Sequence, residues 1–188
     1  GAAAAEIRAS GAERAAVLDV SSPALAVALF ASAWAGVPFV PLNYRLTGAE
    51  LDRLIEQITP CHLVTDADRA APLGTRAGVT ACAREDYLSR ARSSSERAPE
   101  WNMDPEEIAI LLFTSGTTGP PKAAVLRHKH LVSYILAPVE FGSAPETAAG
   151  LVCVPPYHIA GMAAIASSVY SGRRIVQLAS FDPDAWIE

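Results

Sequence analysis

Residues 16–66 alternate short apolar runs with longer segments that carry helix signals, and this alternation limits the possible folds more than any other feature. The runs at 16–20, 37–42 and 62–66 have the length and apolar content of buried strands. Residues 21–36 carry serines at their amino end, a proline in the first turn and a glycine at the stop, which are helix boundary signals. Strand, helix and strand at this spacing predict right-handed βαβ units on a parallel sheet.

The spacing of apolar residues in 48–58 supports the same fold class. Leu51 is followed by leucine or isoleucine three, four and seven positions later, which predicts one buried helix face. The run at 106–113 is almost wholly apolar and predicts a strand buried on both faces. We therefore predict an α/β protein with parallel-rich sheets flanked by helices. Further strands are expected at 123–126, 150–156 and 174–179, and further helices at 2–10, 129–139 and 159–170.

A serine-rich, charged and proline-bearing stretch at 91–105 is typical of a surface connection. It predicts a division of the chain into two α/β lobes, at 1–98 and 99–188. The second lobe would carry the loop considered below.

Composition excludes some classes of function. The chain has 188 residues, 51% of them hydrophobic, and a formal net charge of −5, which argues against a nucleic-acid-binding surface because such a surface needs a basic face. The longest apolar run, at 23–40, is interrupted by serine, glycine and proline, so no integral membrane segment is expected. The amino end has no signal-peptide pattern, and a cytoplasmic location is expected.

The cysteines and histidines do not form a recognisable metal-binding pattern. Cys61, Cys82 and Cys153 are far apart in the sequence and predict ordinary buried thiols of a reducing compartment. His128 and His130 are two residues apart and would point to different sides of a helix. The cysteines and histidines therefore predict neither a disulfide framework nor a metal site of their own.

The segment 113–126, "FTSGTTGPPKAAVL", places hydroxyls, glycines and a lysine between two apolar stretches. Its glycines allow successive backbone N–H groups to point into one concavity, and such a nest binds anions with several oxygens. Lys122 adds a charge that can reach the same anion. The pattern is not a Walker A loop, because a proline precedes the lysine and an alanine follows it. The alternative is a solvated hairpin loop rich in turn-forming residues.

The stretch "LLFTSGTTGPPKAAVLRHKHL" resembles the signature phosphate loop of the adenylate-forming enzymes: acyl- and aryl-CoA synthetases, luciferases and adenylation domains of nonribosomal peptide synthetases. The resemblance extends upstream through residues 22–66 and downstream to "VPPYHIAGM", so it covers essentially the whole chain. It implies the fold of the family's large amino-terminal domain and a reaction in two steps. A carboxylate attacks the α-phosphate of MgATP to give an acyl-adenylate and pyrophosphate, and the thiol of coenzyme A then displaces AMP.

The resemblance also implies roles for single residues. Thr114 would help to hold Mg²⁺, and the loop would wrap the β- and γ-phosphates of ATP, where preorganised donors stabilise the leaving pyrophosphate. His158 would act catalytically, with Tyr157 beside it, near the acid and adenylate pocket; the alternative for His158 is an ordinary histidine at a helix start. The residues implied to bind ATP are Thr114, Ser115, Gly116, Thr117, Thr118, Gly119, Pro120, Pro121, Lys122 and Tyr157.

Other polar residues are interpreted as structural. Asn43, Tyr44 and Arg45 follow a predicted strand and precede a predicted helix, so a turn is favoured over a substrate contact. Ala123 departs from the family pattern, which commonly has glycine there.

The family's later motifs, including its ribose-binding aspartate and its adenylation lysine, do not occur before Glu188. We therefore expect a truncated part of the amino-terminal domain, without the carboxy-terminal domain and inactive by itself. Apolar surface left uncovered would favour self-association.

The parent is expected to be an ATP-dependent acyl-CoA ligase acting on a small-molecule carboxylic acid, fatty or otherwise hydrophobic, in fatty acid metabolism. One alternative is an adenylation domain of the peptide-synthetase type. The other is a nucleotide- or pyrophosphate-binding module without catalysis.

Overall fold

The structure is a computed structural model that describes residues 1–46, 48–93, 95, 104–114 and 121–187, with the backbone alone for Thr114. Its main sheet has six strands in the order β4-β3-β1-β2-β5-β6. The first five strands in this order are parallel to their neighbours, and β5 and β6 pair antiparallel. The strands are β1 (Arg14–Leu18), β2 (Phe39–Pro41), β3 (Cys61–Thr65), β4 (Val79–Ala83), β5 (Ile108–Thr114) and β6 (Lys122–Arg127).

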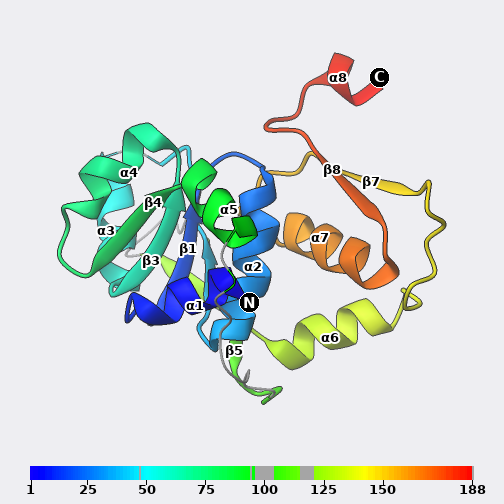
Figure 1. Cartoon of the computed structure of the whole chain (residues 1–188), viewed down its shortest axis with the longest axis horizontal. Coiled ribbons are helices and arrows are strands. Elements are labelled where there is room, and N and C mark those ends of the chain that lie inside the picture. The colour runs from blue at the N-terminus through cyan, green and yellow to red at the C-terminus, as the bar shows by residue number, and fades with distance from the viewer. Residues whose placement is uncertain (47, 94, 96–103, 115–120, 188) are drawn as a thin grey trace.

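Helices cover both faces of the parallel strands (Figure 1). Along β1, Val17 packs into the core of one face, whereas Ala16 and Leu18 pack into the core of the other. This double burial explains why the strands are almost continuously apolar. The first face is covered by α1 (Ala2–Ala9), α2 (Pro23–Ala35) and α5 (Arg84–Ser93), and the second by α3 (Gly48–Ile58) and α4 (Ala67–Gly74).

A smaller unit follows the main sheet. Two parallel strands, β7 (Ala149–Val152) and β8 (Arg174–Gln177), form a second sheet, and α7 (Ile159–Ser171) connects them and packs on them. Helix α6 (His128–Leu136) packs on α7, and α8 (Pro183–Ile187) lies near the carboxyl end of the chain (Figure 1). Val152, Met162 and Ile165 join the core on the α2 side of the main sheet, so the two sheets share one apolar layer.

The carboxyl ends of the two parallel sheets meet. Ser21, just after β1, donates its backbone N–H to the carbonyl of Ala179 at 3.3 Å. The side-chain amide of Gln177 donates to the Ser21 hydroxyl at 3.4 Å. Ligands of open α/β sheets bind outside the carboxyl ends of the strands, and here two such edges adjoin.

The structure confirms most of the predicted elements and corrects several details. Helix α2 begins after Ser22 and ends at Gly36, whose φ of 76° is the left-handed conformation that glycine adopts readily. Helix α5 continues to Ser93, so the surface connection predicted from residue 91 was placed too early. The carboxyl half of β5 is only half-buried, because its neighbour β6 is itself exposed from Lys122 to Val125.

The remaining predictions concern larger features. Helices α4, α5 and α8 and strand β4 were not predicted. The division into lobes at 1–98 and 99–188 stays a prediction, and β5 and β6 belong to the same sheet as β1–β4. Within the described ranges, the helices are all too short or too polar to cross a bilayer.

Candidate functional site

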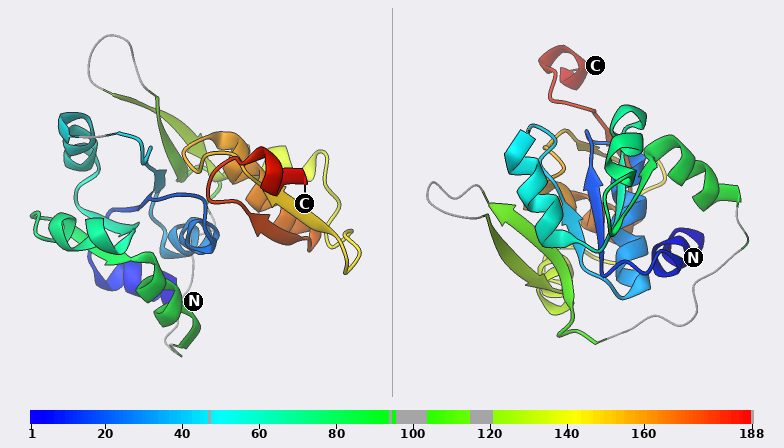
Figure 2. Two further views of the ribbon diagram at one scale, coloured as in Figure 1. Left: turned by 90° about the horizontal axis from the view of Figure 1, so that it is seen from above. Right: turned by 90° about the vertical axis from the view of Figure 1, so that its left-hand side faces the viewer.

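The β5–β6 hairpin carries the predicted phosphate loop to the carboxyl edge of the sheet. Strand β5 runs parallel to β2, with Ile110 opposite Phe39, so its last residue lies at the edge where β2 also ends. Thr114 and Lys122 face each other as the last pair of the antiparallel ladder. Figure 2 shows the two strands of the hairpin side by side at one end of the sheet.

The described part of the predicted loop consists of the Thr114 backbone, Pro121 and Lys122. Lys122 is exposed and Pro121 is half-buried at the start of β6. No acidic residue occurs between Thr114 and Lys122. The other predicted loop residues, Ser115, Gly116, Thr117, Thr118, Gly119 and Pro120, lie outside the residues that the structure describes.

Tyr157 and His158 lie between β7 and α7, and the local backbone brings their rings together. His158 donates its backbone N–H to the carbonyl of Pro155 at 3.0 Å, which closes a tight turn. The same residue is the N-cap of α7, with extended backbone angles and no side-chain hydrogen bond to the helix end. The two ring centroids are 4.8 Å apart. Tyr157 is half-buried and His158 is exposed.

Tyr44 joins this aromatic group from the end of β2. Its ring lies edge-to-face on Tyr157, with centroids 5.7 Å apart and an interplanar angle of 64°. The guanidinium of Arg45 lies 5.8 Å from the centroid of the Tyr44 ring. The carboxyl edge of the main sheet and the loop after β7 therefore meet at three aromatic side chains.

The sequence analysis missed the contact of Tyr44. The predicted turn is present, since the Asn43 side chain accepts a hydrogen bond from the backbone N–H of Arg45 at 3.0 Å. The turn also presents Tyr44 to Tyr157, which the local pattern cannot show. Its position in the sequence could have indicated this role, because Tyr44 follows the carboxyl end of a parallel strand, where ligands of such sheets bind.

Two arginines on this edge are paired with aspartates. Arg69 donates to the backbone carbonyl of Tyr44 at 3.4 Å and forms an ion pair with Asp66 at 3.5 Å. Asp19, at the end of β1, is 3% exposed, and both its oxygens accept from Arg84, at 2.6 and 2.8 Å. These hydrogen bonds raise the pKa of Arg84. The buried carboxylate is thus paired and adds little repulsion toward a phosphate.

Comparison with known proteins agrees with this geometry. The family model described as "AMP-binding enzyme" matches residues 2–188. The chain belongs to the AMP-binding enzyme family. The main sheet, the hairpin and the aromatic group all lie inside the matched region.

Individual relatives of this chain include a CoA ligase and a peptide synthetase. The feruloyl-CoA synthase of an Amycolatopsis species is 31% identical over 182 residues, which cover 92% of this chain and 35% of that protein. The nonribosomal peptide synthetase ivoA of Emericella nidulans is 33% identical over 138 residues, covering 72% of this chain and 8% of that protein. This chain therefore spans about a third of the CoA ligase and much less of the synthetase.

Among solved structures, the ATP-bound MatB of Rhodopseudomonas palustris superimposes with a TM-score of 0.82 at 27% identity. The superposition covers 98% of this chain and 39% of that one. The arrangement of sheets and helices is thus the one found in that ATP-binding protein.

Proposed function

We propose that this chain supplies the ATP-binding and acid-binding parts of an ATP-dependent acyl-CoA ligase. The observation that carries the proposal is that β5, whose last residue Thr114 pairs with Lys122, ends on the carboxyl side of the sheet beside β2, and that Tyr44, just after β2, contacts the Tyr157–His158 turn. A phosphate grip and an aromatic surface on neighbouring edges suit a reaction that joins a nucleotide to an organic acid.

The hairpin would hold the triphosphate of ATP. Lys122 would place its ammonium against the β- and γ-phosphates, beside the hydroxyls and backbone N–H groups of residues 114–120. Mg²⁺ would be held with the help of Thr114 and would neutralise phosphate charge. These donors fit the group because they are hydroxyls, amides and an ammonium without a competing carboxylate in the segment.

The aromatic group would form one wall of the acid pocket. Tyr44 and Tyr157 are both half-buried, so they offer apolar ring surface to a hydrophobic acid. His158 is exposed beside them and would donate a hydrogen bond to the carboxylate or the adenylate, which orients the acid toward the α-phosphate. The thiol of coenzyme A would then attack the acyl carbon, with AMP as the leaving group.

An adenylation domain of the peptide-synthetase type is the second candidate, because the synthetase relative is 33% identical to this chain. The acid and the acceptor distinguish the two. A ligase takes an acid without an α-amino group and transfers it to free coenzyme A. An adenylation domain takes an amino acid and transfers it to a carrier-bound thiol. A module that binds nucleotide without catalysis is the third candidate, and it would bind MgATP but transfer nothing.

Equilibrium titration of the chain with MgATP and, separately, with magnesium pyrophosphate tests the phosphate grip. Removing one charge-assisted hydrogen bond in Lys122→Ala should weaken both ligands by about 10- to 100-fold. Lys129→Ala is the matched control, because Lys129 is the other lysine of the chain and is paired with Glu106 at 2.7 Å. Equal losses in the two variants would contradict a specific grip by Lys122.

Binding of different carboxylic acids then distinguishes the three candidate functions. With MgATP present, a hydrophobic carboxylic acid should bind to the wild-type chain and lose affinity by about tenfold in Tyr157→Ala. Selective binding of amino acids would favour the peptide-synthetase reading. Binding of neither class would leave a nucleotide-binding module as the explanation.

A further inference from the structure

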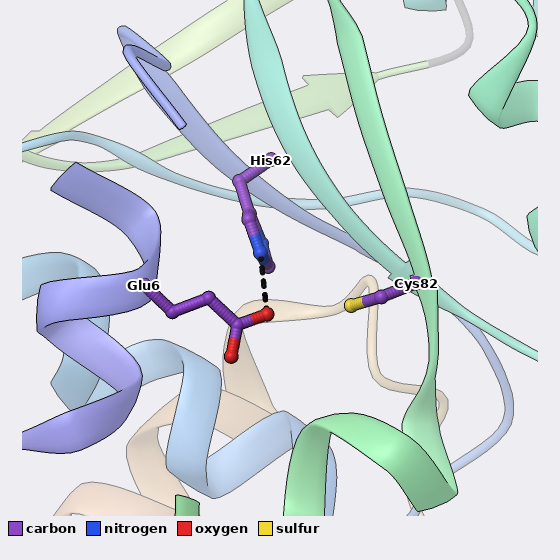
Figure 3. A group of neighbouring side chains, drawn as sticks. All are labelled: Glu6, His62 and Cys82. Atoms are coloured by element: carbon purple, nitrogen blue, oxygen red, sulfur yellow. Dashed lines mark hydrogen bonds and ion pairs between the residues drawn. The ribbon is translucent and has the colours of Figure 1, made fainter. Parts of the chain in front are cut away.

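Three potential metal ligands converge on the first face of the main sheet, away from the candidate ATP site. They are the carboxylate of Glu6 on α1, the imidazole of His62 on β3 and the thiol of Cys82 on β4 (Figure 3). The Glu6 carboxylate lies 3.1 Å from His62 Nε2, and all three ligand atoms lie within 4.8 Å of one another. His62 is 1% exposed, and the other two residues are half-buried.

The register of the sheet explains this convergence. Val64 of β3 is paired with Cys82 of β4, so His62, two residues earlier than Val64, points to the same face as Cys82. Helix α1 packs against α2 and α5 on this face and brings Glu6 over both side chains. The residues are far apart in sequence, which is why the spacing of cysteines and histidines predicted no metal site.

The geometry points to a cation site: we propose that Glu6, His62 and Cys82 bind a divalent transition metal of the zinc type. Nitrogen, sulfur and oxygen ligands in this combination are those that Zn²⁺ takes. A cation placed centrally would lie about 2.5 Å from each ligand atom, and zinc bonds of about 2.0–2.3 Å then need only small side-chain movements. The proposal does not depend on the function proposed for the ATP site.

A buried hydroxyl next to the cluster supports the proposal of a bound metal ion. Tyr87 of α5 is fully buried, and its ring lies 5.9 Å from that of His62. Among the described residues, its hydroxyl finds no hydrogen-bond partner. An unpaired buried hydroxyl is unfavourable by about 1–3 kcal/mol. A metal-bound water in the fourth position would give this hydroxyl a partner, since catalytic and open zinc sites keep such a water.

Metal binding must overcome a nearby positive charge and remove the proton of the Cys82 thiol. Arg90 donates to both oxygens of Glu6, at 2.8 and 3.1 Å, and also hydrogen-bonds to the Cys82 thiol, so its positive charge opposes a cation there and it must move away from two of the ligands when a metal binds. Asp86 contributes negative charge near Cys82. Burial raises the pKa of the Cys82 thiol to about 11, so the metal must displace its proton, which is released to solvent. Arg90 is nearly half exposed, so it can retain one Glu6 oxygen or turn to water.

Titration of the chain with Co²⁺ in place of Zn²⁺ tests the site, because a thiolate bound to Co²⁺ gives a charge-transfer absorption band that other ligands do not. We expect the band in the wild-type chain, its loss in Cys82→Ser and its retention in Cys153→Ser, a matched control at a half-buried cysteine in the second unit. Zinc affinity from competition with a chelator should fall by about 100-fold in Cys82→Ser. It should rise by about threefold or more in Arg90→Gln, because a repelling charge is removed.

Two outcomes would overturn the proposal. One is the absence of the band in both the wild-type chain and Arg90→Gln. The other is a band that survives in Cys82→Ser or disappears in Cys153→Ser, since the thiolate would then come from elsewhere. Urea unfolding of each variant establishes that it is folded. Cys82→Ser and Arg90→Gln are mild changes at partly exposed positions, so the test does not require substitution of the buried His62.

Discussion

The parts of the chain before residue 94 and after residue 103 bury their apolar side chains to very different degrees. In the first part, the sheet is covered on both faces, and its large exposed apolar side chains are Phe30 and Trp34 on α2. In the second part, every element from β6 to α8 carries at least one large apolar side chain that is exposed. Few residues there are fully buried, among them Ile110, Met162 and Ile165.

This difference suggests that the first part of the chain contributes most of the stability and the second part most of the candidate site. The first part carries most of the core on each face of the main sheet, and about 25 cal/mol is gained for each Å² of apolar surface that it buries. The second part depends on that core, because its buried residues join the layer beside α2. It also carries most of the candidate ATP site. We therefore expect substitutions to affect folding mainly in the first part and binding mainly in the second.

The largest contrast should come from two leucines on helices. Leu25 of α2 is 0% exposed and Leu136 of α6 is 53% exposed. Leu25→Ala should lower the free energy of unfolding by about 2–5 kcal/mol, because it leaves a cavity in the core. Leu136→Ala should change it by about 0.5 kcal/mol or less. Urea unfolding of both variants measures these free energies. Similar decreases in the two variants would mean that the second part is as well packed as the first.

Acid should weaken the first part through Glu6. Burial opposes ionisation of this carboxyl, but hydrogen bonds from His62 and Arg90 outweigh burial and lower its pKa from 4.5 to about 2. The stabilisation is complete above pH 4.5 and is lost as the pH falls toward 2, because the native carboxylate must then be protonated. We expect a loss of about 2 kcal/mol over this range, after allowing for partial exposure of the pair.

Two variants isolate that pH dependence, measured as the urea midpoint in metal-free buffer. Glu6→Gln should flatten the profile between pH 4.5 and 2. Glu106→Gln should leave it unchanged, since Glu106 is an exposed carboxylate of the second part that pairs with Lys129 at the surface. An identical slope in the wild type and Glu6→Gln would show that other carboxyls account for the acid sensitivity.

The contact between the two parts should be measurable as a smaller coupling. A double-mutant cycle of Tyr44→Ala and Tyr157→Ala should give a coupling free energy of about 1 kcal/mol, because both rings are partly buried. Phe141 and Tyr170 form a pair of similar geometry, with centroids 5.3 Å apart and the same 64° interplanar angle, within the second part. Phe141 is highly exposed, so its cycle should give about half that coupling or less. A larger coupling free energy for Phe141 and Tyr170 than for Tyr44 and Tyr157 would contradict the assignment of Tyr44 to the aromatic wall of the acid pocket.

The smallest effect should appear in association between copies. Strand β6 is at the end of the sheet order and Val125 on it is 45% exposed, so its outer edge offers a strand and apolar surface to a second copy. Val125→Lys should weaken self-association by about threefold, as measured by sedimentation equilibrium. Val176→Lys, on β8, provides a comparison at another exposed valine. No association in the wild type would contradict the expectation.

The sequence predicted the elements whose signals are local. Helix α2 could be bounded because Ser22, Pro23 and Gly36 each act on the backbone at their own position. Helix α4 was missed because it is short and contains Pro72, which normally argues against a helix interior. The family loop was recognised from its residues, but its anchoring depends on the pairing of β5 with β2, which no local pattern encodes.

The remaining features could not be predicted from the sequence, because they depend on contacts between residues that are far apart in it. Tyr44 meets Tyr157, and Glu6 meets His62 and Cys82, only after the sheet has assembled. Sequence reasoning assigned Tyr44 to a turn and the cysteines to ordinary buried thiols. The turn is present, and Cys61 is buried, but Cys82 and Cys153 are only half-buried. Both interpretations omit the partner that the fold supplies.

The single parallel register pair between Phe39 and Ile110 bears on the order in which the chain folds. Strands β1 to β4 pair with near neighbours in sequence, whereas β5 must return to β2 across the two strands and three helices that separate them. Such long loop closure is slow. We therefore expect the edge of β2 to stay unpaired until residues 108–127 have been made, and the β5–β6 hairpin to be the last part of the main sheet to dock. A substitution that slows this docking would expose that edge to aggregation without changing any residue of the candidate ATP site.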